Sequence, residues 1–263
     1  MSNDIPLFDG EMRIGDAGIF TYCHDYTHPT LKIAVKLIGT NHLGQRAYYR
    51  KIRQLLHDAS QVFHEQLSLD SREQLTEDLV DLRSEICGNT ALSQKFISAL
   101  SAYFVATDLY FSSSMMMEAH AFQNESCLRK WVSVTSPACT DMEERLIKLC
   151  THIPDSRQKS VVDHVRHTLD QIGSGSYTLR EYGETFAFFW SDNNMRAVFD
   201  QALSQNEAKT CIQLLDTYTT KKNGRNSIGI KFGAAHIPNL RAALLSKGFA
   251  HVNSYKLCAV SFS

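Results

Sequence analysis

The stretch VKLIGTNHLGQR, residues 35–46, runs from apolar residues into a glycine and, three positions later, into His42. The stretch IGIKFGAAHIPNL, residues 228–240, repeats this order with His236 in the corresponding place. In each stretch a strand-like run precedes the glycine, and helical spacing of apolar residues follows the histidine. The repetition predicts two equivalent strand–G-x-x-H–helix units, one near each end of the chain.

The segments around the first unit complete a βαβ pattern. Two strand-like runs, 17–24 and 31–38, are separated by turn-forming residues and predict a hairpin. Apolar residues at helical spacing predict a helix over 45–59, and alternating residues predict a strand over 61–67. A strand, a helix and a second strand in this order predict a parallel sheet.

The second unit lies in a similar setting, after a long helical middle. The pattern predicts a strand over 227–232, a helix over 238–247, and a strand or hairpin over 251–262. The middle has helical spacing over 70–122, 141–172 and 178–220, with breaks at Gly88–Asn89, 133–140, 173–176 and 191–194.

The predicted fold is therefore α/β. We expect a mixed sheet built from both chain ends as two strand–G-x-x-H–helix pseudo-repeats, with a large central helical insert. The expected organisation is a single domain over 1–263, with core segments 12–68 and 225–263 and an insert over about 70–222.

Composition limits the classes of function. The formal net charge is -1 and the two signs are mixed along the chain, so nucleic acid and anionic membranes are not expected partners. The least polar stretch, 96–107, is shorter than the roughly 20 residues of a membrane span, and the acidic N-terminus does not resemble a secretory signal. The 7 cysteines form no C-x-x-C pair, which indicates reduced thiols and a cytoplasmic location. The oligomeric state stays open, a homo-oligomer included.

The two histidines are candidate metal ligands. Ligands gather at the carboxyl ends of strands in open α/β sheets, and a glycine there lets the backbone approach a ligand closely. If the strands before Gly39 and Gly233 are parallel neighbours, His42 and His236 emerge at one edge, close enough to share an ion. Neutral imidazoles suit zinc, manganese, iron or cobalt. The alternative for either histidine is a turn or helix-capping role.

Glu65 is the candidate third ligand. It lies in QVFHEQL, the strand expected after the first G-x-x-H helix, and should end near the same edge. Because side chains alternate along a strand, Glu65 and His64 point to opposite faces, and only Glu65 is favoured. A carboxylate would complete a two-histidine, one-carboxylate set with positions left for water or substrate. The alternative is an edge-strand charge paired with Arg50 or Arg53.

The two ends of the chain resemble the TraB/PrgY/GumN family, which is related to the Tiki proteases. The matching segments are LIGTNHLGQRAYYRKIRQLLHDASQVFHEQL and IGIKFGAAHIPNLRAALLSKGF. The resemblance implies an α/β core of two pseudo-repeats and a metal-dependent hydrolase, with His42, Glu65 and His236 in the matching positions. Wider relatives include a haem-binding protein and macrolide esterases, so the fold alone does not fix the activity.

The chain departs from the family pattern at a position that bears on catalysis. Members often carry an arginine in the helix before the last strand, where this chain reads LSQNEAKTC, with Gln205 or Asn206 in its place. Arg225 and Arg196 are the candidates to substitute for it in space. The C-terminal membrane helices of some members have no counterpart in this sequence.

Other clusters are more simply explained by structure. YCHDYTH, residues 22–28, contains four metal-ligand types, but a hairpin would splay them apart. His164 and His167 fit a solvated helix face. The sequence contains no G-x-S-x-G elbow, P-loop, dinucleotide G-x-G-x-x-G or H-E-x-x-H. Serine hydrolases, nucleotide-dependent enzymes and ordinary zincins are therefore disfavoured.

The first functional hypothesis is a metal-dependent hydrolase of peptides or other amides. Its catalytic residues are Glu65, His42 and His236, which also hold a divalent ion: manganese, cobalt or zinc. Glu65 is either a ligand or the general base that takes a proton from water. The residues that flank the histidines are candidates for contacting the peptide or small-molecule substrate: Gly39, Thr40, Asn41 and Gly233.

The second hypothesis is a non-catalytic binding module on the same scaffold. It would hold a peptide, haem or another small molecule at the same edge of the sheet. The missing family arginine favours this hypothesis, because it leaves the binding residues in place and removes a catalytic one.

Overall fold

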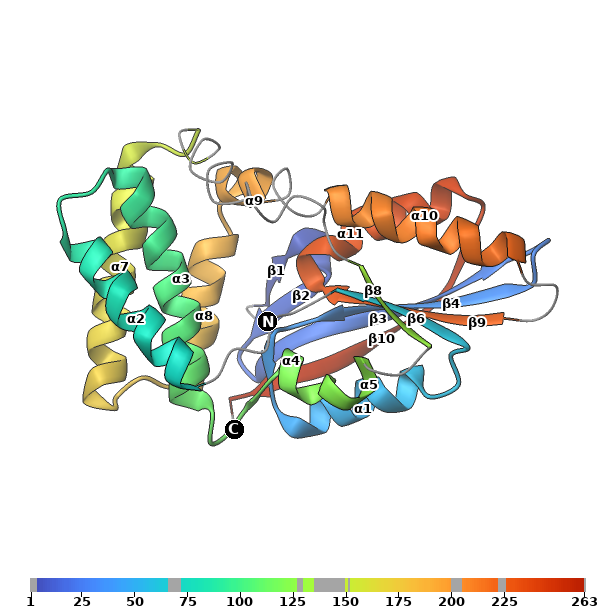
Figure 1. Ribbon diagram of the computed structural model, residues 1–263, viewed down its shortest axis with the longest axis horizontal. Helices are drawn as coiled ribbons and strands as arrows, with labels where there is room; N and C mark the ends of the chain where they lie inside the picture. The colour runs from blue at the N-terminus through green and yellow to red at the C-terminus, as the bar shows by residue number, and fades with distance from the viewer. Residues whose placement is uncertain are drawn as a thin grey trace. The chain divides into compact units, whose positions relative to one another are not determined.

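The computed structural model describes residues 4–65, 72–126, 130–134, 150, 152–199, 205–221 and 226–262. The chain divides into two compact units. The sheet unit comprises Met1–Leu67, Met117–Pro137 and Leu203–Ser263, and the helical unit comprises Ser68–Met116 and Ala138–Ala202. The chain therefore leaves the sheet unit twice and returns to it twice, as the colours of Figure 1 show.

The sheet unit contains a mixed, eight-stranded sheet, which confirms the predicted α/β class. Its strands are β1 (Ile5–Leu7), β2 (Met12–Gly15), β3 (Gly18–His28), β4 (Ile33–Thr40), β6 (Gln61–Glu65), β8 (Trp131–Val134), β9 (Asn226–Gly233) and β10 (Ala250–Ser261). They follow the order β1-β2-β3-β4-β9-β6-β8, with β10 paired to β3. The pairs β4–β9, β9–β6 and β6–β8 are parallel, and the others are antiparallel. The predicted hairpin is β3–β4, and the parallel half is the predicted βαβ sheet.

The two G-x-x-H strands are parallel neighbours, as the sequence predicted. β4 pairs with β9 from Ile33, opposite Asn226, to Thr40, opposite Gly233. β6 pairs with the other edge of β9, so β9 lies between the two strands of the βαβ unit. The two G-x-x-H turns therefore start within one residue of each other at the carboxyl edge of the sheet.

Helices cover both faces of this sheet (Figure 1). On one face lie α1 (Arg46–Leu56), α4 (Glu118–Ala121) and α5 (Gln123–Ser126), and on the other lie α10 (Gln205–Lys221) and α11 (Ile237–Ser246). α1 forms because apolar residues recur at helical spacing and are buried: Tyr48, Tyr49, Ile52 and Leu56. Pro238 stands in the first turn of α11, where its fixed φ suits a helix start.

The main apolar core of the sheet unit lies between β4, β9 and the pair α10–α11. Val35 and Leu37 of β4 meet Ile230 and Phe232 of β9, and Leu215 of α10 packs on the same cluster. Each of these side chains is at most 1% exposed. The sequence interpretation placed α10 in the helical insert, whereas its buried face packs on the sheet, because Cys211 and Leu215 share one side of the helix.

The helical unit contains α2 (Arg72–Cys87), α3 (Leu92–Phe111), α7 (Asp155–Ser174), α8 (Leu179–Trp190) and α9 (Asn193–Phe199). The predicted break at 173–176 is real: α7 ends at Ser174, and Gly175 adopts a left-handed conformation with φ 74°. Thr178 and Glu181 form a capping box that starts α8. Within the described residues, no helix is both long and apolar enough to cross a membrane.

A second sequence expectation within the described residues, besides the placement of α10, is wrong. The stretch 133–140 was expected to be a loop, but Ser133 and Val134 belong to β8, which pairs in parallel with β6. Four residues are too short to display a periodicity, so pairing with a neighbouring strand decides the structure. The remainder, 135–140, and the start of the expected helix at 141–149 lie outside the described residues.

Candidate functional site

The carboxyl edge of β4, β9 and β6 gathers the three predicted site residues. Glu65 is the last residue of β6, and His42 follows β4 by two residues. His236 ends a short 3-10 helix, η4 (Ala234–His236), directly after β9. Because the three strands are parallel and adjacent, these side chains emerge at one edge of the sheet.

Glu65 holds the second G-x-x-H turn through both carboxylate oxygens. Its Oε1 lies 3.3 Å from His236 Nε2, and its Oε2 accepts a hydrogen bond of 2.8 Å from the Gly233 N–H. The side chains of Glu65 and His236 are only 13% and 7% exposed. Burial by itself would raise the pKa of Glu65, but His236, the charge of His42 and the Gly233 N–H lower it well below its ordinary value. Glu65 is therefore an ionised carboxylate across the physiological pH range.

The His42 imidazole lies on the same side of Gly233 as the Glu65 carboxylate. A Cβ atom added to Gly233 would lie 3.2 Å from His42 Nε2 and 3.3 Å from Glu65 Oε2. Glycine is the residue that leaves room for both groups here, which explains the glycine in the second G-x-x-H. One carboxylate, that of Glu65, therefore contacts His236 and shares the space at Gly233 with His42.

Glu118 and Lys231 complete the site, and sequence reasoning missed both. Glu118 Oε2 lies 3.1 Å from His42 Nδ1, and the Glu118 N–H donates a 2.7 Å hydrogen bond to the His42 carbonyl. The other oxygen of Glu118 pairs with the Lys231 ammonium, which also lies 4.9 Å from the centre of the Phe122 ring. The Lys231 and Glu118 side chains are 2% and 1% exposed. Glu118 thus fixes His42 through Nδ1 and leaves Nε2 facing Gly233.

The charges around His42 favour its protonated form. Partial loss of hydration lowers the pKa of His42, but the hydrogen bond to Glu118 and the charges of Glu65 and Glu118 raise it to about 9. The side chain is 57% exposed, so this imidazole is the part of the site most accessible to a ligand. Burial alone would raise the pKa of Glu118, whereas Lys231 and His42 lower it.

The raised pKa of His42 predicts how the free energy of unfolding depends on pH. A folded pKa of about 9 against an ordinary value of 6.5 means that the protonated ring stabilises the fold fully below pH 6.5. This contribution is lost as the pH rises through about 9. In urea unfolding, the stability advantage of the wild type over a His42→Gln variant should therefore shrink between these two pH values. If the difference in unfolding free energy stays constant between pH 6.5 and about 9, the pKa of His42 is not raised.

The residues flanking the first histidine shape the turn. Asn41 is buried, its side-chain amide donates to the Leu43 carbonyl at 2.6 Å, and its own carbonyl accepts from the Tyr49 hydroxyl at 2.8 Å. Gly39 lies tightly against Ile237 at the start of α11. The buried Thr40 hydroxyl has no hydrogen-bond partner among the described residues. Their predicted contact with substrate stays a prediction.

His64 points to the opposite face of β6 from Glu65, as strand alternation predicted, and so lies on the same face as its β9 neighbour Lys231. Its Nδ1 hydrogen-bonds the Glu65 carbonyl at 2.9 Å, and its Nε2 lies 3.2 Å from the Ser133 hydroxyl on β8. The ring packs edge-on against Trp131. Burial lowers the pKa of His64, so the neutral ring is favoured. His64 is a packing residue on the opposite face from Glu65.

The donor set suits a divalent ion in chemical type. Two imidazoles and a carboxylate converge, and His42 has a carboxylate behind it, as metal-ligating histidines usually do. In the part of the chain that the structure describes, however, no group of three or more His, Cys, Asp or Glu residues is arranged to hold a metal ion. Glu65 Oε1 and His236 Nε2 lie 3.3 Å apart, which is a separation that two ligand atoms bound to one ion at about 2.0–2.2 Å can have.

The candidates for the family arginine lie elsewhere or are not described. Arg196 hydrogen-bonds Asn193 within the helical unit. Arg225 and the side chains of Gln205 and Asn206 lie outside the described residues. Among the described residues, Lys231 is the cation that contacts the site, through Glu118.

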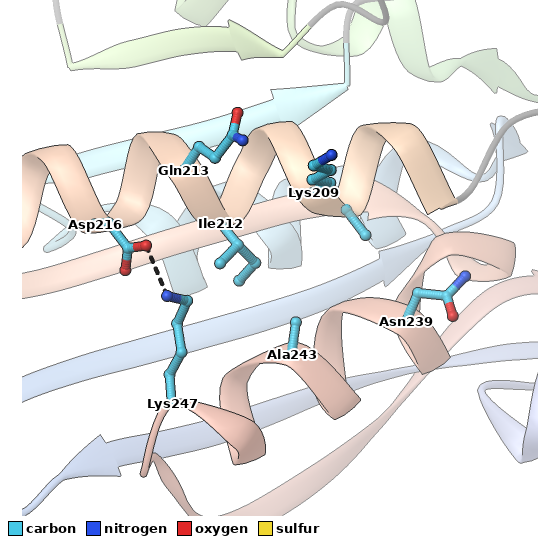
Figure 2. Close-up of a pocket in the computed structure, with 8 residues that line it drawn as sticks. Lys209, Ile212, Gln213, Asp216, Asn239, Ala243 and Lys247 are labelled. Atoms are coloured by element: carbon cyan, nitrogen blue, oxygen red, sulfur yellow. Dashed lines mark hydrogen bonds and ion pairs between the residues drawn. The ribbon is translucent and has the colours of Figure 1, made fainter.

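An open groove of about 420 Å³ lies between α10 and α11 (Figure 2). Lys209, Ile212 and Asp216 face it from α10, and Asn239 faces it from α11. Lys247 crosses its end and pairs with Asp216 at 2.6 Å. None of the lining residues belongs to the candidate site, so the groove does not extend it.

No protein-family model, no curated protein sequence and no solved structure matches this chain. The functional assignment therefore rests on the contacts at the carboxyl edge of β4, β9 and β6. Their central feature is one carboxylate, Glu65, that joins the two G-x-x-H turns.

Proposed function

We propose that the chain is a metal-dependent hydrolase of peptides or other amides and a divergent relative of the TraB/PrgY/GumN family. The observation that supports this proposal is the convergence of His42, Glu65 and His236 on Gly233 at one edge of the parallel strands. When bound, a divalent ion such as manganese, cobalt or zinc would polarise the scissile carbonyl as a Lewis acid.

The chain's own residues orient this site before any substrate arrives. Glu118 holds His42 Nδ1, so the ring presents Nε2 to the shared space. Glu65, which is itself held by the Gly233 N–H, fixes the position of His236. Preorganised side chains of this kind lower the cost of reaching a productive geometry.

The electrostatics favour Glu65 as a ligand over Glu65 as a general base. An efficient general base has a pKa near the working pH, whereas the pKa of Glu65 is well below its ordinary value. A permanently ionised carboxylate beside two histidines is suited to neutralising a cation. Binding of the cation at His42 would release its proton, so affinity should rise with pH up to about 9.

A non-catalytic binding module is the second candidate. Both oxygens of Glu65 are already engaged, by His236 and the Gly233 N–H, which fits a structural role for the carboxylate. The exposed His42 would then be a cationic contact for an acidic group on a peptide, haem or another small molecule.

Three measurements on one protein preparation separate these functions. Metal content and an absorbance scan for haem show what is bound, and a peptide-cleavage screen with added manganese, cobalt or zinc shows turnover. The negative control is a His42→Ala/His236→Ala double variant, which should keep its secondary structure and lose both metal and turnover. Turnover that survives in the double variant would contradict the proposed site, and a stoichiometric ligand without turnover would favour the binding module.

We also propose a cytoplasmic location. It is supported by the described cysteines, all of which are free thiols. Cys23, Cys150 and Cys211 are buried, and Cys87 and Cys258 are exposed. Cys127 and Cys139 lie outside the described residues.

A further inference from the structure

A second cluster of reactive groups lies in the sheet unit, on strands β3 and β10. His24 Nδ1 is 2.8 Å from the Ser254 hydroxyl, and His24 Nε2 is 2.6 Å from a carboxylate oxygen of Glu11. Ser254 and His24 are directly opposite each other in the antiparallel pair. A hydroxyl, an imidazole and a carboxylate in a hydrogen-bonded row form the arrangement that activates a serine nucleophile.

The carboxylate at the end of this row is firmly held. Glu11 is 1% exposed, and its second oxygen pairs with the Arg241 guanidinium of α11. A carboxylate can only accept hydrogen bonds, so the proton of a neutral His24 ring stands on Nε2. The lone pair of Nδ1 then faces Ser254, whose O–H donates to it. This is the tautomer that a general base requires.

A β-bulge brings a second imidazole to the same hydroxyl. The pairing of β10 with β3 shifts register between His251 and Asn253. In a regular strand, side chains three positions apart point to opposite faces. The extra residue in the bulge shifts this alternation by one position, so His251 and Ser254 point to the same face. His251 Nε2 therefore lies 2.9 Å from the Ser254 hydroxyl oxygen and can donate to it. The oxygen is held from one side while its hydrogen points to His24.

The exposure of these groups fits a reactive centre. Ser254 is exposed, so an ester can reach it, whereas His24 is 5% exposed. We propose that Ser254 is a nucleophile activated by His24, and that it accepts acyl groups from activated esters. Glu11 and Arg241 are positioning residues in this centre. The proposal is independent of the site at His42 and His236.

The reaction balances without any further reagent. The Ser254 oxygen forms a bond to the acyl carbon, and its proton passes to His24 Nδ1. The bond between the acyl carbon and the leaving oxygen breaks, and that oxygen keeps the electron pair and takes up the proton from His24 Nδ1, which makes His24 neutral again. Water later attacks the serine ester with His24 accepting its proton, which releases the carboxylic acid and restores the hydroxyl.

The test uses 4-nitrophenyl acetate with the full chain. The wild type should carry an acetyl group on the peptide that contains Ser254, located by mass spectrometry. Ser254→Ala should lower 4-nitrophenolate release at that centre by about 100-fold, the size expected for loss of base-assisted attack. The exposed Ser246→Ala is the matched control and should leave labelling unchanged. Acetyl groups found only at other residues, or equal release by Ser254→Ala, would overturn the proposal.

A second variant tests the role of Glu11 separately from folding. Glu11→Gln keeps the shape, but its amide can donate to His24 Nε2 and move the ring proton to Nδ1. Nitrogen-15 chemical shifts of His24 should report the switched tautomer, while acylation falls by about 100-fold. Acylation at the wild-type rate with a switched tautomer would overturn the proposal. The His42→Ala/His236→Ala variant should label normally, which separates this result from the outcome at the proposed hydrolase site.

Discussion

A Glu65→Gln variant should lose hydrolysis by about a thousandfold, within the range for removing a residue that acts directly on the reacting groups. Glutamine keeps the length of the side chain and can still accept the Gly233 N–H, so the strand edge should keep its shape. It removes the negative charge that faces both His42 and His236. The measurement is kcat and KM for a cleaved peptide in the presence of the activating metal.

The matched control is Asp58→Asn, which makes the same chemical change at a carboxylate that is 94% exposed. Its rate should stay at the wild-type value. Raising the metal concentration should partly restore Glu65→Gln if the carboxylate is a ligand, and should leave it inactive if the carboxylate is the general base. A Glu65→Gln variant that keeps more than half of the wild-type rate would show that neither role is correct.

A Lys231→Met variant should lose about 3–5 kcal/mol of unfolding free energy, which is the cost of leaving one partner of a buried ion pair uncompensated. The two side chains are 2% and 1% exposed, so Glu118 would lose its buried cationic partner and keep its contact with the more exposed His42 ring. Methionine fills a similar volume and can keep the contact with Phe122. Chemical unfolding of the variant and the wild type at the same pH measures the loss.

The double variant Lys231→Met/Glu118→Gln provides the internal control. Removing both charges should restore much of the stability, because no buried carboxylate is left without its lysine partner. It should not restore hydrolysis, since Glu118 also holds His42 Nδ1. If the single variant is as stable as the wild type, Lys231 and Glu118 are not a coupled buried pair.

The sequence predicted the parts of the site that follow from strand geometry. A glycine at the end of an apolar run and a histidine three positions later located both turns, and the βαβ pattern placed Glu65 at the same edge. Alternation along β6 separated Glu65 from His64 correctly. These features depend on local periodicity and on the parallel pairing of β4 with β9.

Glu118 could not be predicted, because its position depends on where the chain returns from the helical unit. It lies in a helix of four residues, too short to show a pattern, and its partner His42 is far away in the sequence. Lys231 did leave a signal. A lysine between Ile230 and Phe232, in a strand covered on both faces, must be paired with an acid, because charged residues are rarely buried alone.

The positions of Glu65 and Glu118 also bear on how the segment between them can change in evolution. The chain leaves the sheet unit at Leu67, two residues after Glu65, and re-enters it at Met117, one residue before Glu118. The two ends of this segment thus lie next to Glu65 and Glu118, both of which interact with His42. The entropy of closing a loop grows only logarithmically with its length, by about 0.6 kcal/mol for each doubling. The entropy of loop closure therefore sets little limit on the length of residues 68–116, whereas the packing of α3 on α7 ties any replacement of this segment to the rest of the helical unit.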